Sequence, residues 1–267
     1  MVQNLISSVD AVPSELISKM NISAPAVLVN QCDEDSDETI EFKGYRVLVL
    51  NRNERGVGRS RNLCIDNCSE DIILFSDEDI VYNDDYVQIL ENMFETHPEA
   101  DMIFFNVEVC DERRTYWNDS FRKVSGMNCG RYPAYSIAAR RDALIKSGVK
   151  YSVLFGGGAK YSNGEDSLFI RECLKSGMRL YASDECIGRE EARESTWFKG
   201  YTKKFFFDRG VLFYFLYGAF AYIWGIRFVL VKKDMFKGEI GRGKAFKLIC
   251  DGIRRGRSEK HNKNIAV

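Results

Sequence analysis

Short apolar runs alternate with amphipathic stretches along most of the chain. Strand-length runs lie at residues 26–29, 46–50, 72–75, 102–107 and 178–182. Helical spacing of apolar residues marks the stretches at 59–68, 84–96 and 165–176. This alternation predicts an α/β fold with a mixed, largely parallel sheet flanked by helices. Residues 2–9 carry several polar side chains, so they predict only a short, irregular strand.

Two of the predicted helices carry recognisable start and stop signals. The helix at 84–96 follows Asn83, has two aspartates in its first turn and ends before a His-Pro pair. The helix at 165–176 has Asn163 as its candidate N-cap and Gly177 at its C-terminal end. Such residues satisfy or terminate the free backbone groups at helix ends.

The C-terminal part of the chain is apolar and aromatic. Sixteen residues, from Val211 to Ile226, pass without a charge, and basic residues bracket the segment. A membrane-spanning helix needs about 20 predominantly apolar residues, so the segment is borderline. Three interpretations stay open: an interfacial or re-entrant helix, which is favoured, a true span, or a helix packed on the protein's own core. We therefore expect two parts, residues 1–200 and a helical extension at 201–267.

Charge is distributed unevenly along the chain, although the net charge is only -1. Residues 197–267 contain 16 Lys and Arg against 5 Asp and Glu, whereas residues 1–196 contain 22 against 34. A basic, aromatic-rich end predicts contact with an anionic membrane surface and no nucleic acid as a partner.

Cysteine and histidine usage limits the possible chemistry. The eight cysteines form no CxxC pair, and the start of the chain shows no basic, apolar leader. We therefore expect a reduced, cytoplasmic protein without disulfides or a zinc site. The only histidines are His97, beside a proline, and His261, in the basic tail. Carboxylates are the remaining candidates for acid–base catalysis and metal binding.

An apolar strand that ends in acids is the most informative motif. Residues 72–79 read IILFSDED. Side chains alternate along a strand, so Asp77 and Asp79 are expected on one side and Glu78 on the other. Close carboxylates repel each other, and a hard cation such as Mn²⁺ or Mg²⁺ relieves the repulsion while it binds substrate phosphates. The alternative is a solvated acidic loop.

A glycine-rich stretch precedes a pair of acids near residue 165. Residues 155–169 read FGGGAKYSNGEDSLF. The glycines allow close approach of a ligand to the backbone, and the helix N-terminus favours charged carboxylates at Glu165 and Asp166. An ionised carboxylate there can accept a proton. The alternative is a capping box in which Asn163 and Asp166 satisfy free backbone amides.

Two further loops are candidates for nucleotide contacts. Residues 54–62 read ERGVGRSRN and open a helix, which suits a pyrophosphate or an acidic partner. A dinucleotide-binding GxGxxG interpretation is weak, because Arg61 replaces the third glycine. The loop at 30–36 reads NQCDEDS. Its acids are either solvated or supply one carboxylate to a base or ribose.

In this order, the motifs resemble glycosyltransferase family 2, the inverting enzymes of the GT-A fold. The family has an acidic loop, a Gly-Arg-Asn turn, a DxD-type cluster after an apolar strand, and a glycine-rich loop with a Glu-Asp pair. The matching positions here are Asp33, residues 58–62, residues 76–79 and residues 165–166. The resemblance covers about residues 1–200.

The resemblance implies roles for these residues. Asp33 would contact the nucleobase, Asp77 the ribose, and Asp79 a Mn²⁺ or Mg²⁺ ion between the phosphates, while Asp166 would be the general base. The remaining nucleotide-sugar-binding candidates are Gly58, Arg61, Asn62 and Glu78. The acceptor-side candidates are Gly157, Gly158, Glu165 and Trp197. After the Glu-Asp pair the sequence has no histidine before His261 in the basic tail, and Trp197 is alternatively a packed residue at a domain junction.

The implied function is transfer of a sugar, with inversion, from a UDP-linked donor to a saccharide or lipid-linked acceptor during synthesis of a cell-surface polysaccharide such as a capsule. The expected location is cytoplasmic and peripheral, on the inner face of the plasma membrane. The irregular first strand leaves open a catalytically silent subunit that binds a nucleotide-sugar or polysaccharide. A sugar-nucleotide pyrophosphorylase is disfavoured, because the long glycine-rich signature of that group is missing.

Overall fold

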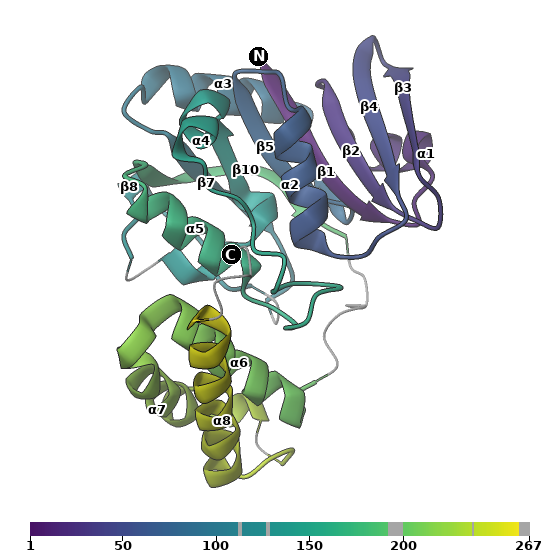
Figure 1. The fold of residues 1–267 in the computed structure, drawn as a ribbon. Coiled ribbons are helices and arrows are strands. Elements are labelled where there is room, and N and C mark those ends of the chain that lie inside the picture. The colour runs from purple at the N-terminus through teal and green to yellow at the C-terminus, as the bar shows by residue number, and fades with distance from the viewer. Residues whose placement is uncertain (112–113, 127–128, 192–199, 237, 262–267) are drawn as a thin grey trace.

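The computed structural model describes residues 1–111, 114–126, 129–191, 200–236 and 238–261. It consists of an α/β body and a bundle of helices packed beneath it (Figure 1). The strands are β1 (Val2–Val9), β2 (Ala26–Gln31), β3 (Ser36–Phe42), β4 (Tyr45–Arg52), β5 (Ile72–Asp77), β6 (Ile80–Tyr82), β7 (Met102–Glu108), β8 (Arg122–Lys123), β9 (Ile137–Arg140) and β10 (Leu180–Glu190). The α-helices are α1 (Pro13–Lys19), α2 (Val57–Asn67), α3 (Tyr86–Thr96), α4 (Arg141–Ser147), α5 (Glu165–Lys175), α6 (Lys203–Tyr217), α7 (Ala221–Val231) and α8 (Arg242–His261).

The described strands form one mixed sheet in the order β3-β4-β2-β1-β5-β9-β7-β10-β6, with β8 paired to β10. Strands β4, β2, β1 and β5 are mutually parallel, so they end at the same edge of the sheet. The strand order reverses beside β1, whose neighbours are β2 on one side and β5 on the other. Ligands of open α/β sheets bind at such a switch point, outside the carboxyl ends of the strands.

Helices cover both faces of the sheet. One apolar cluster joins the sheet to α2, α4 and α5 through residues such as Ile65, Leu144 and Phe169. The other joins it to α1 and α3 through residues such as Ile17 and Leu90. The strands between these layers are buried on both sides, which explains their continuous apolar runs. The expected fold class is therefore confirmed.

The prediction of a short, irregular first strand is wrong. Strand β1 lies in the middle of the parallel part of the sheet, and seven of its eight residues are buried. Its polar side chains are satisfied by partners far away in the sequence. Asn4 donates to Ser76 Oγ (3.2 Å) and accepts from the Tyr86 hydroxyl (2.7 Å), while Ser7 bonds Ser60 Oγ (2.7 Å). Buried polar groups with such partners do not interrupt a strand.

The remaining predicted strands and helices are confirmed in type and place. Strand β3 was not anticipated, because residues 36–42 are acidic and largely exposed, and they form the edge of the sheet beside β4. Helix α3 begins at Tyr86, so both aspartates expected in its first turn precede it. Gly177 follows α5 with φ +90°, as expected for a C-terminal glycine.

The predicted N-cap of α5 is wrong. Gly164, not Asn163, is the capping residue, and no side chain caps the helix there. Gly164 has φ +113°, and a Cβ at this position would lie 2.5 Å from the Leu212 side chain. The start of α5 is therefore shaped by a tight contact with α6, which local sequence does not reveal.

The C-terminal bundle is built on close packing of α6 against α8. A Cβ at Gly210 would lie 2.1 Å from the Ile249 carbonyl oxygen, and a Cβ at Gly252 would lie 2.0 Å from the Phe207 carbonyl oxygen. Only glycine permits this approach of two backbones. Residues 203–231 are long and apolar enough to cross a membrane, but the segment bends at Gly218, whose φ is +56°. Its first half, α6, is largely buried in the protein, whereas α7 keeps an exposed apolar face.

Candidate functional site

The acidic cluster lies at the switch point of the sheet. Asp77 is the last residue of β5, and Glu78 and Asp79 form the turn to β6. Glu78 Oε2 accepts a hydrogen bond from the backbone N–H of Val9 (2.9 Å), so it holds the end of β1. The pKa of the nearby Tyr135 hydroxyl is raised by burial first, then by Tyr116 and Glu190, and to a smaller extent by Asp77 and Asp79. Glu78 therefore turns toward β1, and the placement of Asp77 and Asp79 on one common side stays a prediction.

Arg61 connects this cluster to the Glu-Asp pair. Its guanidinium, on α2, is 5% exposed and donates to Asp77 Oδ1 (2.8 Å) and to Asp166 Oδ1 (2.8 Å). It also lies 3.7 Å from Glu165 and packs 5.1 Å from the centre of the Tyr151 ring. Burial disfavours the charged guanidinium, but Asp77 and Asp166 outweigh it and raise the pKa of Arg61. One cation thus holds carboxylates from β5 and α5 together.

Asp166 is held in a defined position by both of its oxygens. Oδ1 accepts from Arg61, and Oδ2 accepts from the Ala134 backbone N–H (3.2 Å). The capping-box alternative is therefore wrong for this residue. Burial raises the pKa of Asp166 to about 7, with Glu165 and Asp77 adding to the rise and Arg61 opposing it. A carboxylate that titrates near neutral pH is suited to accept a proton from a substrate hydroxyl.

The glycine-rich loop packs directly on the start of α2. The Val57 backbone N–H donates to the Gly157 carbonyl oxygen (2.9 Å). Gly158 has φ +76°, and a Cβ there would lie 2.9 Å from the Gly56 nitrogen. The glycines therefore let the loop pack closely against the protein's own backbone, and not only against a ligand. The loop also connects the turn before α2 with the acids of α5.

Two of the nucleotide-binding candidates also have structural contacts. A Cβ at Gly58 would lie 2.4 Å from the Ser152 carbonyl oxygen. The Asn62 side chain pairs with both backbone groups of Tyr151, accepting from its N–H (2.7 Å) and donating to its carbonyl oxygen (2.9 Å). These residues hold the segment at 151–152 against α2, and contact with a nucleotide stays a prediction for them.

A cavity of about 490 Å³ opens at the ends of β1, β2 and β4. Its lining includes Asp10, Asn30, Cys32, Asp33, Glu38 and Asn51. Asp33 is almost fully exposed there and lies 3.4 Å from Arg55. Asn30 and Asn51 are hydrogen-bonded to each other (3.0 Å), which fixes the floor of the cavity. The cavity borders the switch point and offers polar groups from three strand ends to a ligand.

The structure thus brings Arg61, Asp77, Glu165 and Asp166 into one cluster, while Asp33 lies separately in the cavity. Trp197 lies outside the described residues. Sequence reasoning missed the Ala134 amide and the rings of Tyr135 and Tyr151. A backbone amide leaves no sequence signal, and Tyr151 is one buried aromatic among many.

A metal site was expected at Asp79. Among the residues that the structure describes, no group of three or more His, Cys, Asp or Glu is arranged to hold a metal ion. Asp77 is already paired with Arg61. The half-buried carboxylate of Asp79 is a hard oxygen donor, and Mg²⁺-type ions are commonly held by one or two carboxylates together with substrate phosphates. Asp79 offers such an oxygen just after β5, and its role as a metal ligand stays a prediction.

The mixed sheet, the acidic site at its switch point and the helical end define a GT-A glycosyltransferase fold. TarS from S. aureus in complex with UDP-GlcNAc superposes with a TM-score of 0.58 at 13% identity, covering 97% of this chain and 73% of that chain. The mannosyltransferase PcManGT from Pyrobaculum calidifontis, in complex with GDP-Man and Mn²⁺, has a TM-score of 0.51 at 11% identity, covering 96% and 75%. At these identities the likeness establishes the fold.

Residues 26–154 match the family model of glycosyl transferase family 2. The resemblance to this family that the motifs indicated is confirmed. No curated protein matches the chain. Family and fold together support a glycosyltransferase that uses a nucleotide-sugar donor.

Proposed function

We propose that the protein transfers a sugar from a UDP-linked donor to a saccharide or lipid-linked acceptor, with inversion, during synthesis of a cell-surface polysaccharide. The observation that carries this proposal is the pair of carboxylates, Asp77 and Asp166, held on either side of Arg61 at the switch point of the sheet. A donor-side acid and a candidate base then lie on opposite sides of one buried cation.

The donor is proposed to extend from the cavity to the end of β5. Asp33 offers a carboxylate to the base, and Asp77 to the ribose. Asp79 is the group that would hold Mn²⁺ or Mg²⁺ against the diphosphate, and such an ion neutralises the charge of the departing nucleoside diphosphate. The nucleotide in the TarS complex is UDP-GlcNAc, which supports a UDP-linked donor without fixing it.

Asp166 is proposed to activate the acceptor. Its free electron pair takes the proton of an acceptor hydroxyl, the hydroxyl oxygen forms the new bond to the anomeric carbon, and the bond from that carbon to the diphosphate breaks. A single displacement of this kind inverts the anomeric centre. The contacts from Arg61 and Ala134 orient the carboxylate without requiring it to be protonated.

The test is a nucleotide-release assay against UDP-, GDP- and dTDP-sugars with Mn²⁺, comparing the wild type with Asp166→Asn. We expect transfer to fall about 10²- to 10⁴-fold, the usual contribution of a general base, while metal-dependent nucleotide binding persists. Asp142→Asn is the matched control, because Asp142 is also an acid in the first turn of a helix but is 93% exposed. Unchanged turnover in Asp166→Asn would remove this residue as the base.

The alternative function, a catalytically silent subunit that binds a nucleotide-sugar or polysaccharide, was suggested by the first strand. It depended on an eroded first strand, and β1 is a complete strand at the centre of the parallel region. A silent subunit that binds a nucleotide-sugar would keep the same switch point, so the activity of wild type and Asp166→Asn in the assay above separates the two functions.

We also propose that the protein is cytoplasmic and binds the inner face of the plasma membrane through α7 and the residues flanking it. Much of the exposed apolar surface among the described residues gathers there, namely at Phe220, Tyr222, Ile223, Ile226, Leu230, Val231 and Met235. Arg227 and the lysines at 232 and 233 lie in the same segment. An apolar face with basic neighbours suits the boundary of an anionic bilayer.

Flotation with anionic and with neutral liposomes tests this surface. Ile223→Glu places a charge on the exposed face of α7, and we expect it to abolish binding to anionic vesicles without loss of folding. Ile145→Glu is the control, because Ile145 is a comparably exposed apolar residue on α4. Equal flotation of both variants would exclude α7 as the attachment surface.

A further inference from the structure

Two buried carboxylates of the helical bundle take no part in the chemistry described so far. Asp208 lies on α6 and its side chain is 2% exposed, and Glu259 lies on α8 and its side chain is 4% exposed. Both contact the same short segment of the α/β body, residues 160–162, which ends three positions before Glu165 of α5. Buried acids are retained only where hydrogen bonds and charges satisfy them, so their partners indicate what they do.

Asp208 binds the backbone and side chain of one loop residue. Its Oδ2 accepts from the Ser162 N–H (3.0 Å) and from the Ser162 hydroxyl (2.9 Å). The Lys204 ammonium pairs with the same oxygen (2.5 Å) and also donates to the Lys160 carbonyl oxygen (3.0 Å). The N-terminal half of α6 therefore holds the loop from one side.

Glu259 holds the neighbouring residues. Its Oε1 accepts from the Lys160 ammonium (2.5 Å) and from the Tyr161 hydroxyl (3.1 Å), and Arg255 supplies a second cation at 2.7 Å. Helix α8 therefore contacts the loop at Lys160 and Tyr161, next to Ser162, which α6 contacts. Three consecutive loop residues are bonded to two helices that lie more than 40 positions later in the chain.

Apolar contacts between the loop and α6 extend from these hydrogen bonds to the start of α5. The Phe155 and Tyr161 rings pack with Leu212 and Phe215 of α6 in one buried cluster. Leu212 also closes over Gly164, the residue that caps α5. On its other side the loop bonds the start of α2 through Gly157. The loop is thus held between α2 and the bundle, and Asp166 follows directly.

We propose that Asp208 and Glu259 are positioning residues that fix the glycine-rich loop at 154–164 and thereby place Asp166 toward the acceptor. The physical reason is the loop's composition. It contains four glycines, whose backbone has the largest conformational freedom of any residue, so its own sequence does not define one shape. This inference rests on the proposed function, because it assigns the bundle a role in that reaction.

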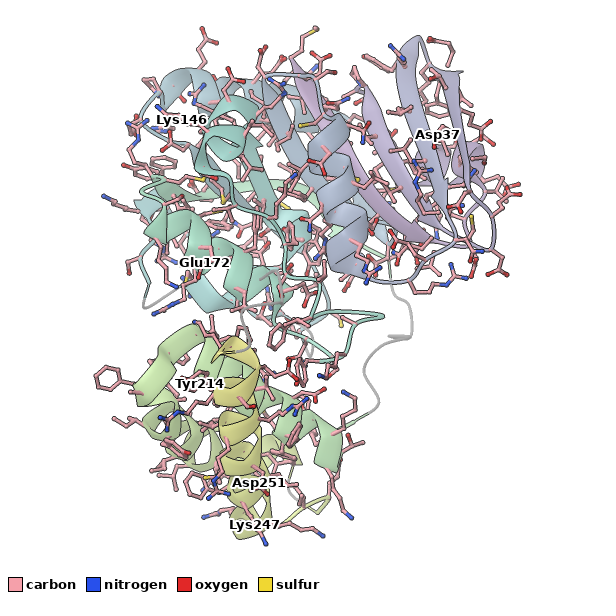
Figure 2. The ribbon with its side chains drawn as sticks, in the orientation of Figure 1. Asp37, Lys146, Glu172, Tyr214, Lys247 and Asp251 are labelled. Carbon is pink, nitrogen blue, oxygen red and sulfur yellow. The ribbon has the colours of Figure 1, made fainter. Side chains whose placement is uncertain are left out.

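The test compares Asp208→Ala, Ser162→Ala and Glu259→Gln with wild type in the full-length protein. Asp251→Asn is the control, because Asp251 is a partly exposed acid on α8 that pairs with Arg254 and lies toward the far end of the bundle (Figure 2). We expect kcat/KM for the acceptor to fall at least tenfold in Asp208→Ala, while the Kd of the nucleotide stays within twofold. Asp208→Asn keeps an acceptor oxygen for Ser162, so it should recover much of the lost activity.

Hydrogen exchange of the loop provides a readout that does not depend on activity. Faster exchange of residues 154–164 is expected in Asp208→Ala and Glu259→Gln, with unchanged exchange in β1 and β5. If Asp208→Ala does not fold, Ser162→Ala removes one of the same contacts from the loop side. Loop exchange equal to wild type, or faster exchange with full kcat/KM, overturns the inference. If the wild type transfers no sugar from any donor in the panel, the proposed function fails, and the loop exchange still decides whether the bundle holds the loop.

Discussion

Replacing Arg61 with Met removes the cation that joins the two sides of the site. The guanidinium donates to Asp77 and to Asp166 at 2.8 Å each, and it is nearly buried. Methionine fills a similar length without charge. The variant leaves three carboxylates, Asp77, Glu165 and Asp166, close together without their shared counter-ion. We expect the protonated form of Asp166 to become favoured, since charge neutralisation is then possible only by binding a proton.

The size of the effect follows from the geometry. Two unit charges about 4 Å apart attract by about 4 kcal/mol at an effective dielectric constant of about 20, which corresponds to about three pKa units. The Asp166 side chain is 22% exposed, so solvent screening makes this an upper value. Starting from a pKa of about 7, loss of Arg61 should raise the pKa of Asp166 toward a value between about 8 and about 10.

The assay is the dependence of kcat/KM on pH. A general base must be ionised, so activity falls as the pH decreases through its pKa and reaches a plateau above it. Wild type should reach that plateau about one unit above pH 7. The activity of Arg61→Met should still rise above pH 8, and its loss at pH 7 relative to wild type should be about 5- to 500-fold. Arg59→Met is the control, because Arg59 lies on the same helix but is exposed and pairs with Glu54.

A midpoint near pH 7 in Arg61→Met would refute the reasoning, because the cation would then have no influence on the base. A folding check belongs to the same experiment, since removal of one partner of a buried ion pair typically costs about 3 to 5 kcal/mol. Arg61→Lys keeps the charge but cannot reach both acids with one ammonium. Its midpoint is therefore expected between those of wild type and Arg61→Met.

Two further predictions concern the metal and the packing of α2. Asp79→Ala should abolish the Mn²⁺ dependence of nucleotide binding measured by calorimetry, and persistent dependence would place the ion elsewhere. Gly58→Ala should lower the stability by about 1 to 3 kcal/mol, the usual cost of overpacking, because the new Cβ would lie 2.4 Å from the Ser152 carbonyl oxygen. Thermal unfolding measures this loss, with Gly126→Ala, where the added Cβ meets nothing within 4 Å, as the control. Equal melting temperatures for the two glycine variants would contradict it.

The sequence predicted those parts of the fold in which local pattern and burial agree. Strands β2, β5 and β7 are buried on both faces, so their apolar runs are continuous and easily recognised. Strand β1 is equally central, but its polar residues are satisfied by Ser60, Ser76 and other residues distant in sequence. Strand β3 is exposed and acidic, and its order comes from pairing with β4. The first deviation arises from long-range hydrogen bonds and the second from antiparallel pairing in a hairpin, and periodicity encodes neither.

The site was predictable as a set of acids but not as an arrangement. Asp77 and Asp166 were found because a strand end and a helix start each give a local signal. The sequence did not predict that Arg61 connects them, because Arg61 and Asp166 are 105 positions apart. Arg61 was assigned to the nucleotide from its place in a glycine-arginine turn. The structure uses its two terminal nitrogens for carboxylates, and a direct nucleotide contact stays a prediction.

Asp166 depends on two separate sets of buried charge. Its carboxylate is oriented by Arg61 and the Ala134 amide, whereas its backbone follows a loop that Asp208 and Glu259 hold from the bundle. The first set determines where the two oxygens point, and the second determines where the start of α5 lies. A base that must accept a proton from a bound hydroxyl needs both, because its oxygen must be within about 3 Å of the donor. If Asp166 is the base proposed above, the C-terminal helices contribute to catalysis by fixing its position.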